Sequence, residues 1–217
     1  MKLIELTRDI FHVMFPTQLE LTSTLLRFQE YFEGQEFKGK IFTLEEYKEW
    51  YVANSVMGKK TGMFTYYEDW SGFNFPSDTL GPFYDGKFDP LSDAESHFLN
   101  LFRGKRGKKF YIIGTHSETD TPVEDFRHEC AHALFFLNES YKMRAIGILL
   151  RVPEGIRADI NRYLHKSTYC PSVWLDEAHA HILADLEELD VEGIDIEPLR
   201  PFHYQLNVLF SEFMSTN

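Results

Sequence analysis

Cysteine is nearly absent from the sequence, because Cys130 and Cys170 are the only two among 217 residues. Two thiols are too few to hold a chain of this length in a disulfide framework, so a reducing compartment is expected.

Long hydrophobic runs are missing too. The longest uncharged apolar stretch, residues 145–150, is far shorter than the roughly 20 residues needed to cross a bilayer. The first fifteen residues are interrupted by charges, unlike a signal peptide. We therefore expect a cytoplasmic protein with no membrane partner.

Basic residues are also scarce. The chain has 22 Lys and Arg against 34 Asp and Glu, which gives a net charge of −12. A protein this acidic is repelled by phosphate backbones, so we expect no nucleic-acid partner. The single basic run, residues 103–109, is spaced by glycines and is expected to form a solvated turn.

Aromatic side chains are abundant instead. They make up 16% of the chain, with 20 Phe and 11 Tyr, while the hydrophobic content of 43% and the charged content of 26% are ordinary for globular proteins. Rings in this number predict a ring-packed core. Residues 61–88 hold many of the rings in a turn-rich stretch. We expect a covering loop packed by its own rings, and the alternative is a substrate-facing lobe.

Hydrophobic periodicity and capping signals predict a helix-rich α+β protein. The best strand is expected at residues 109–115. Helices are expected at about 19–31, 44–53, 92–102, 121–138, 141–150, 154–165, 173–189 and 202–213. No repeat or linker divides the chain, so we expect a single domain over residues 1–217. Within it, residues 1–108 form a helical, aromatic-rich part and residues 109–217 a metal-site part.

The pattern H-E-x-x-H lies inside one of the predicted helices and is formed by His128, Glu129 and His132. Residues i and i+4 share one face of a helix, so the two imidazoles can bind one Zn²⁺ while the intervening Glu lies beside the open position of the metal. The same helical projection points Cys130 to the opposite, apolar side. Cys130 is therefore predicted to pack in the core rather than to bind metal.

Catalytic zinc usually has three protein ligands, and residues 174–181 (WLDEAHAH) contain candidates for the third. On a helix, Glu177 and His181 share a face, whereas His179 projects about 160° away from Glu177. We assign Glu177 as the third ligand and His181 as a neighbour able to hydrogen-bond a metal-bound side chain. The alternative is a solvated acidic helix, because Asp185 and further acidic residues follow.

A helical Glu located 45 residues after H-E-x-x-H resembles the gluzincin branch of zinc metallopeptidases, over about residues 109–189. The resemblance implies that Glu129 is the general base and that three side chains bind zinc, namely His128, His132 and Glu177. It also implies a small zincin-like core, to which the helices predicted before residue 109 are additional N-terminal helices. In such a core, an edge strand precedes the metal-binding helix and pairs with extended peptide substrate, and the strand predicted here takes that place.

The sequence departs from the gluzincin pattern at one position and leaves another role open. His181 stands where many gluzincins have Asp. The residue that stabilises the oxyanion is not identified by spacing. Tyr169 and His165 are the candidates by position after the motif helix, followed by His203 and Tyr204.

These observations together predict a zinc-dependent metallopeptidase that hydrolyses peptide bonds with zinc-activated water. Zn²⁺ is the expected cofactor, and a peptide or protein is the expected substrate. One alternative is a zinc-binding, non-catalytic interaction module, in which the aromatic segment 61–88 recognises a partner. Another is a zinc hydrolase that acts on a non-peptide amide. The sequence does not indicate the oligomeric state.

Overall fold

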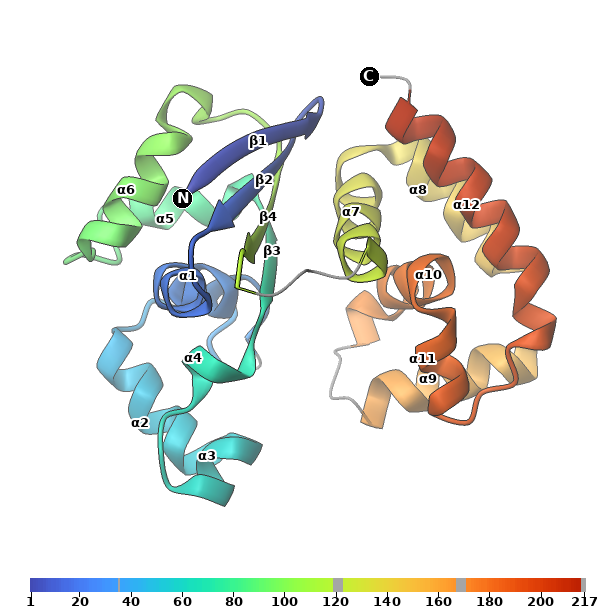
Figure 1. The fold of residues 1–217 in the computed structure, drawn as a ribbon, viewed down its shortest axis with the longest axis horizontal. Coiled ribbons are helices and arrows are strands. Elements are labelled where there is room, and N and C mark those ends of the chain that lie inside the picture. The colour runs from blue at the N-terminus through green and yellow to red at the C-terminus, as the bar shows by residue number, and fades with distance from the viewer. Residues whose placement is uncertain (35, 119–122, 167–170, 216–217) are drawn as a thin grey trace. The chain divides into compact units, whose positions relative to one another are not determined.

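The chain forms two compact units, Met1–Thr121 and Pro122–Asn217. The computed structural model describes residues 1–34, 36–118, 123–166 and 171–215. Its elements confirm the helix-rich α+β class, with a small sheet in the first unit and helices alone in the described part of the second (Figure 1). Over these described residues, every helix is too short or too polar to span a bilayer.

The elements of the first unit are strands β1 (Lys2–Thr7), β2 (Ile10–Phe15), β3 (Gly72–Pro76) and β4 (Tyr111–His116), helices α1 (Gln18–Glu33), α2 (Leu44–Asn54), α3 (Val56–Thr61), α4 (Tyr66–Asp69), α5 (Gly81–Tyr84) and α6 (Asp93–Leu101), and short 3-10 turns η1 (Ser77–Leu80) and η2 (Arg103–Lys105). The capping boxes at Thr43–Glu46 and Ser92–Glu95 are both present and begin α2 and α6 as predicted. The basic run contains η2 and lies in a turn before β4.

The sheet has the order β1-β2-β4-β3, so β4 lies between two partners. It pairs in parallel with β2 and antiparallel with β3. The prediction of an edge strand at residues 109–115 is therefore wrong. The physical reason is visible in its composition, because a strand whose residues are all buried is typical of a sheet interior rather than an edge. One of the two neighbours of β4 is β2, which forms a pair with β1 at the N-terminus. The charged residues within β1 had made this pair of strands hard to recognise in the sequence.

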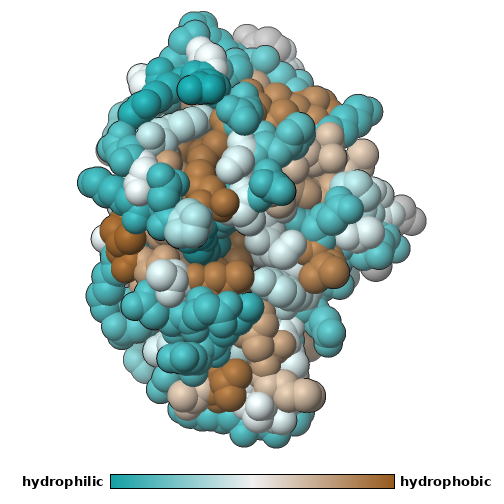
Figure 2. Space-filling view, turned by 90° about the vertical axis from the view of Figure 1, so that its left-hand side faces the viewer, coloured by the Kyte–Doolittle hydropathy of each residue, from teal (hydrophilic) through white to brown (hydrophobic). Residues whose placement is uncertain are grey.

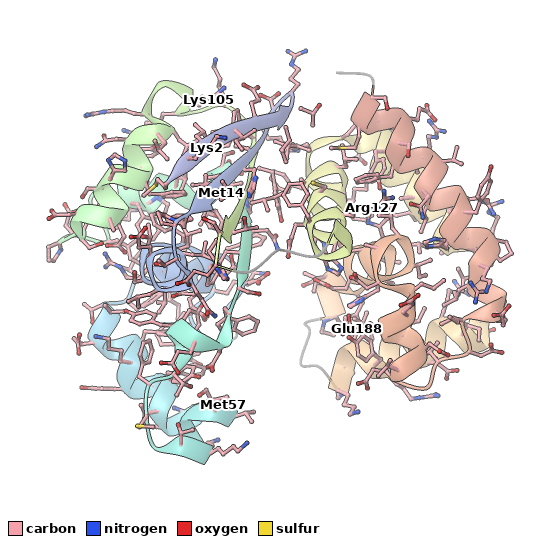
Figure 3. All side chains as sticks on the ribbon, viewed as in Figure 1. Lys2, Met14, Met57, Lys105, Arg127 and Glu188 are labelled. Carbon is pink, nitrogen blue, oxygen red and sulfur yellow. The ribbon has the colours of Figure 1, made fainter. Side chains whose placement is uncertain are left out.

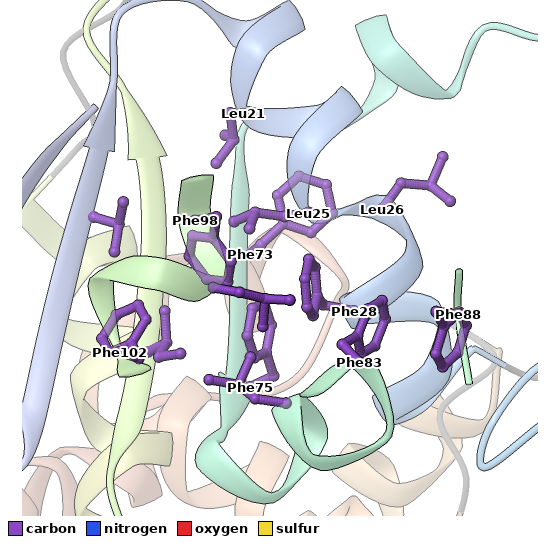
Figure 4. Packing of buried hydrophobic residues seen from close by; sticks show 14 of the residues in the cluster. Leu21, Leu25, Leu26, Phe28, Phe73, Phe75, Phe83, Phe88, Phe98 and Phe102 are labelled. Atoms are coloured by element: carbon purple, nitrogen blue, oxygen red, sulfur yellow. The ribbon is translucent and has the colours of Figure 1, made fainter. Parts of the chain in front are cut away.

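The core of the first unit lies between the sheet and helices α1, α5 and α6 (Figure 1). Figure 4 shows Phe28 of α1 among the rings, with its centroid 3.9 Å from that of Phe83, which stacks in turn on Phe88 at 3.9 Å. Helix α1 approaches β4 closely at Gly114, where an added Cβ would lie 2.6 Å from a methyl carbon of Leu25. The ring-packed core is thus confirmed.

The aromatic segment 61–88 contributes to this core and is not a separate loop. Phe73 and Phe75 come from β3 and are buried on the helix-covered face of the sheet. Phe83 and Phe88 lie in and after α5 and are buried as well. The rings therefore pack as predicted, but they pack against α1 and α6 in addition to one another.

A buried ion pair joins α1 to α6. Arg27 donates two hydrogen bonds to the carboxylate of Glu95, from Nε to Oε1 and from Nη2 to Oε2, each 2.7 Å long. Its Nη1 donates to the carbonyl of Phe88 at 2.9 Å. Arg27 is 7% and Glu95 4% exposed, so both charges have left water and depend on each other.

Figure 2 shows one face of the molecule, on which several separate hydrophobic areas lie among mostly hydrophilic residues. Exposed large apolar side chains of the first unit include Leu19, Ile41, Val56, Met63 and Trp70. Apolar residues scattered in this way are ordinary on protein surfaces.

The second unit contains α7 (Val123–Leu137), α8 (Glu139–Leu149), α9 (Glu154–Lys166), η3 (Pro171–Val173), α10 (Trp174–Ala184), α11 (Leu186–Val191), η4 (Glu197–Leu199) and α12 (Arg200–Ser215). Helices α7 and α10 lie side by side, and α12 packs on α8 and α10. The single helix predicted at 173–189 is divided in two at Asp185, which has left the helical conformation with φ −120° and ψ 42°. The capping residues expected before α7, at positions 121 and 122, lie outside the described residues.

Candidate metal centre

Two neighbouring helices of the second unit bring the predicted ligands together. His128 and His132 lie one turn apart on α7, with ring centroids 4.7 Å apart. Glu177 projects from the first turn of α10, and its Oε2 atom lies 3.8 Å from the Nε2 atoms of both histidines. These three ligand atoms lie within 4.8 Å of one another.

The spacing suits a metal ion. Ligand atoms about 2.1 Å from one tetrahedral zinc are about 3.4 Å apart, close to the 3.8 Å separations of Glu177 Oε2 from the histidines. That oxygen is buried and has no hydrogen-bond partner in the described structure. Two imidazoles and one carboxylate are also the set of ligands that several catalytic zinc sites use. The residues present therefore fit Zn²⁺.

The other nitrogen of each histidine contacts a carboxylate. His128 Nδ1 is hydrogen-bonded to Asp185 Oδ2, and His132 Nδ1 lies 3.0 Å from Asp176 Oδ1. A carboxylate at Nδ1 fixes the ring orientation and, in the neutral ring, holds the proton on Nδ1 so that Nε2 can bind a metal. Both rings are thus held with Nε2 directed at Glu177.

The close spacing of these charged groups shifts their pKa values. Burial alone lowers the pKa of His132, but the carboxylates of Asp176, Glu177 and Glu129 outweigh burial and raise this pKa to about 10. Burial raises the pKa of Asp176, yet His132 and His179 outweigh that effect and lower it to about 2. Burial raises the pKa of Glu177, against the opposing effect of the two ligand histidines. A cation that binds here would replace the proton of His132.

Glu129 follows His128 on α7 and is half-buried. Its charge helps to raise the pKa values of both His132 and Cys130, so the carboxylate lies within electrostatic range of the ligands. The Cys130 thiol is 2% exposed, and burial raises its pKa to about 12. Cys130 belongs to neither possible metal-binding group of the described residues, consistent with the predicted packing role.

The two further histidines of α10 lie on different sides of the helix. His181 lies beside His128, with ring centroids 5.0 Å apart, but both its nitrogens lack a hydrogen-bond partner among the described residues. Burial, followed by the charge of His128, lowers the pKa of His181 to about 4, which leaves the ring neutral. His179 is fully buried, and its Nε2 is 2.7 Å from the hydroxyl of Tyr141. His179 therefore points away from the three ligands, as its spacing predicted.

The structure brings none of the described oxyanion candidates into hydrogen-bond contact with the ligands. Tyr169 lies outside the described residues. His165 is exposed near the end of α9 and packs edge-on against Trp174, with centroids 6.3 Å apart. His203 Nδ1 lies 2.8 Å from the carbonyl of Ile182. Tyr204 is 69% exposed. The oxyanion role of Tyr169 and His165 stays a prediction.

The two carboxylates that orient the histidines, Asp176 and Asp185, are not among the site residues predicted from the sequence. Asp176 immediately precedes Glu177, so a helical projection had no reason to direct it at His132. Asp185 entered the prediction only as one of the acidic residues that favoured the alternative of a solvated helix. The signal that would have found both is the need of each zinc-binding imidazole for a partner at its second nitrogen.

Replacing Asp185 by Asn is expected to weaken zinc binding by about tenfold to a hundredfold, because an amide is a weaker acceptor for the His128 N–H. Competition with a chromogenic chelator measures the affinity. Asp190→Asn, at an exposed position of the next helix, is the matched control and should bind zinc like the wild type. Equal affinities in both variants would show that Asp185 does not support His128.

Comparison with other proteins identifies no relative. No family model matches the chain, and no characterised protein or solved structure matches it at a significant level.

Proposed function

We propose that the protein is a zinc-dependent metallopeptidase with a gluzincin-like site. The observation that carries the proposal is the arrangement of His128, His132 and Glu177, whose three ligand atoms converge while each imidazole is held from behind by a carboxylate. A surface cluster of acidic and basic side chains would not bury an unpaired Glu177 oxygen between two imidazole nitrogens.

The residues of the site have different roles in the proposed hydrolysis. His128, His132 and Glu177 would hold the ion. When bound, zinc supplies a Lewis acid that polarises the substrate carbonyl and lowers the pKa of water. Glu129, the carboxylate beside the ligands, takes the proton of the attacking water and later delivers it to the leaving amine. Asp185 and Asp176 keep the imidazole rings oriented throughout.

Peptides are the proposed substrate class because of the resemblance to gluzincins. Hydrolysis of a non-peptide amide would use the same ligands and the same base. Incubation of the zinc-loaded chain with a mixed peptide library and, separately, with a panel of N-acylated amines distinguishes the two. Cleavage restricted to the acylated amines would replace the peptidase proposal by the alternative amidohydrolase.

The metal itself is tested first. The purified protein, dialysed against metal-free buffer after zinc loading, is expected to retain about one tightly bound zinc per chain by plasma mass spectrometry. His132→Ala should lose it, because two ligands bind Zn²⁺ much more weakly than three. His97→Ala, an exposed histidine of α6, is the control and should keep the ion. Wild-type protein without tightly bound zinc would refute the proposed site.

A further inference from the structure

A groove between α8 and α12 of the second unit is not used by the proposed site. Arg144 of α8 donates hydrogen bonds to Glu212 of α12. Arg151, about two turns further on, donates to Gln205, which lies earlier in α12. The two helices are therefore antiparallel neighbours, and the groove that they border has a volume of about 380 Å³.

The surface of this groove is largely apolar. Ile148 and Leu209 lie at its floor and are buried. Tyr204 and Val208, one turn apart on α12, border it and are each more than half exposed. The described side chains of both helices, including those that project outward from α12, are drawn in Figure 3. Contiguous exposed apolar side chains of this kind mark interaction surfaces.

Gly147 lies at the centre of the α8 side of the groove. It shares a face with Met143 and Leu150, which are more than half exposed. Glycine is a poor helix former, yet an added Cβ at Gly147 would meet no atom within 4 Å. No packing among the described residues therefore requires glycine here. The remaining structural use of a helical glycine is to admit the close approach of another backbone.

The groove also differs in charge from the rest of the molecule. Of the 22 basic and 34 acidic side chains, residues 139–151 and 200–215 hold four basic and two acidic ones. The other parts of the chain hold 18 basic and 32 acidic side chains. A weakly basic surface on a strongly acidic protein attracts acidic partners and repels basic ones.

Arg151 is the cation at the rim that has no acidic partner. Arg144 is held by the Glu212 carboxylate through two hydrogen bonds of 2.7 and 2.8 Å. Among the described residues, Arg151 donates only to neutral groups, the carbonyl of Gly147 at 3.2 Å and Gln205 Oε1 at 2.5 Å. Its guanidinium is thereby positioned beside the groove and can still pair with a carboxylate.

We propose that the groove between α8 and α12 binds an acidic, amphipathic helix of another protein. The apolar stripe of such a helix packs on Ile148 and Leu209, its backbone approaches at Gly147, and one of its carboxylates pairs with Arg151. A second copy of the chain fits less well, because a symmetric pair would bring two weakly basic surfaces together. The proposal uses none of the metal ligands and holds whether or not the protein is a peptidase.

Selection from a phage-displayed library of helical peptides, with the purified protein as target, tests the groove. The enriched peptides should carry apolar residues at i, i+3, i+4 and i+7 and a net negative charge. Gly147→Leu should weaken their binding by about tenfold or more, because the new side chain fills the centre of the groove. This variant should fold, since leucine favours helix and the position is open. Gly155→Leu, at an exposed and equally open glycine of α9, is the matched control.

The charge of the rim is tested with the same peptides by fluorescence anisotropy. Arg151→Glu should weaken binding by about tenfold, whereas Arg162→Glu, an exposed arginine of α9, should leave it unchanged. Binding to the wild type should also weaken as salt rises from about 0.05 to 0.5 M.

Three results would overturn the proposal. The first is a library that yields no enriched peptide, and the second is a set of enriched peptides that are basic or that bind Gly147→Leu as tightly as the wild type. The third is a dimer in sedimentation experiments that Gly147→Leu abolishes, which would assign the groove to a second copy of the chain. None of these measurements involves the metal, so failure of the zinc site and failure of the groove are distinguishable.

Discussion

Glu129→Gln is expected to reduce peptide hydrolysis by about 10²–10⁴-fold while leaving one zinc per chain. The amide is close to the carboxylate in size but cannot accept the proton of the attacking water. The ligands are unchanged, because Glu129 is not among the three atoms that converge on the metal position. The loss should therefore fall on kcat rather than on metal content.

The measurement pairs initial rates on a fluorogenic peptide, chosen from the library screen, with metal analysis of the same samples. Glu139→Gln is the matched control, since Glu139 is an exposed residue at the start of α8 and should retain full activity. A Glu129→Gln protein that hydrolyses peptide at the wild-type rate would remove Glu129 from the mechanism. A zinc-bound wild type that cleaves neither peptides nor acylated amines would support the non-catalytic interaction module instead.

Arg27→Met is expected to destabilise the first unit by about 3–5 kcal/mol. The substitution fills most of the volume of Arg27 but leaves the Glu95 carboxylate buried without its cation, and such uncompensated charges are among the costliest defects in a protein interior. The paired variant Arg27→Met with Glu95→Leu should recover most of this loss. Recovery should be incomplete, because Glu95 also accepts the Ser92 N–H in the capping box of α6.

Amide hydrogen exchange in β2 and β4 measures the free energy of opening of this unit without interference from the second unit. Arg106→Met supplies the comparison, because its ion pair with Asp85 is exposed and should contribute no more than about 1 kcal/mol. Equal protection in Arg27→Met and Arg106→Met would show that the buried pair is not a main determinant of stability.

The local features of the fold were accessible from the sequence. Amphipathic spacing located α1, α2, α8 and α9 to within a few residues, and the capping boxes determined where α2 and α6 begin. These signals are encoded by neighbours in the chain. The position of β4 in the sheet was not accessible in this way, because it depends on β2 pairing with it from some 100 residues earlier. The composition of a strand alone does not identify the strands with which it pairs.

In the candidate site, too, the features that depend on neighbours in the chain were predicted and those that depend on tertiary packing were not. The spacing of His128 and His132 and the helical register of Glu177 predicted three residues that the structure brings together. Their supporting carboxylates depend on two tertiary facts, the packing of α10 on α7 and the end of α10 at Asp185. A continuous helix would place Asp185 on the face of His181, but only the packing of α10 on α7 brings its carboxylate to His128.

The three ligands come from only two helices, and His132 and Glu177 are separated by about 45 residues of chain. A bound ion would therefore act as a removable cross-link that closes a long loop. The chain-entropy relation for cross-links gives about 4 kcal/mol for a loop of this length. Since all three ligands belong to Pro122–Asn217, this contribution stabilises one unit alone. Zinc supply would thus control how long the second half of the chain survives heat or proteases, while the sheet and aromatic core of the first half keep the stability that their own packing provides.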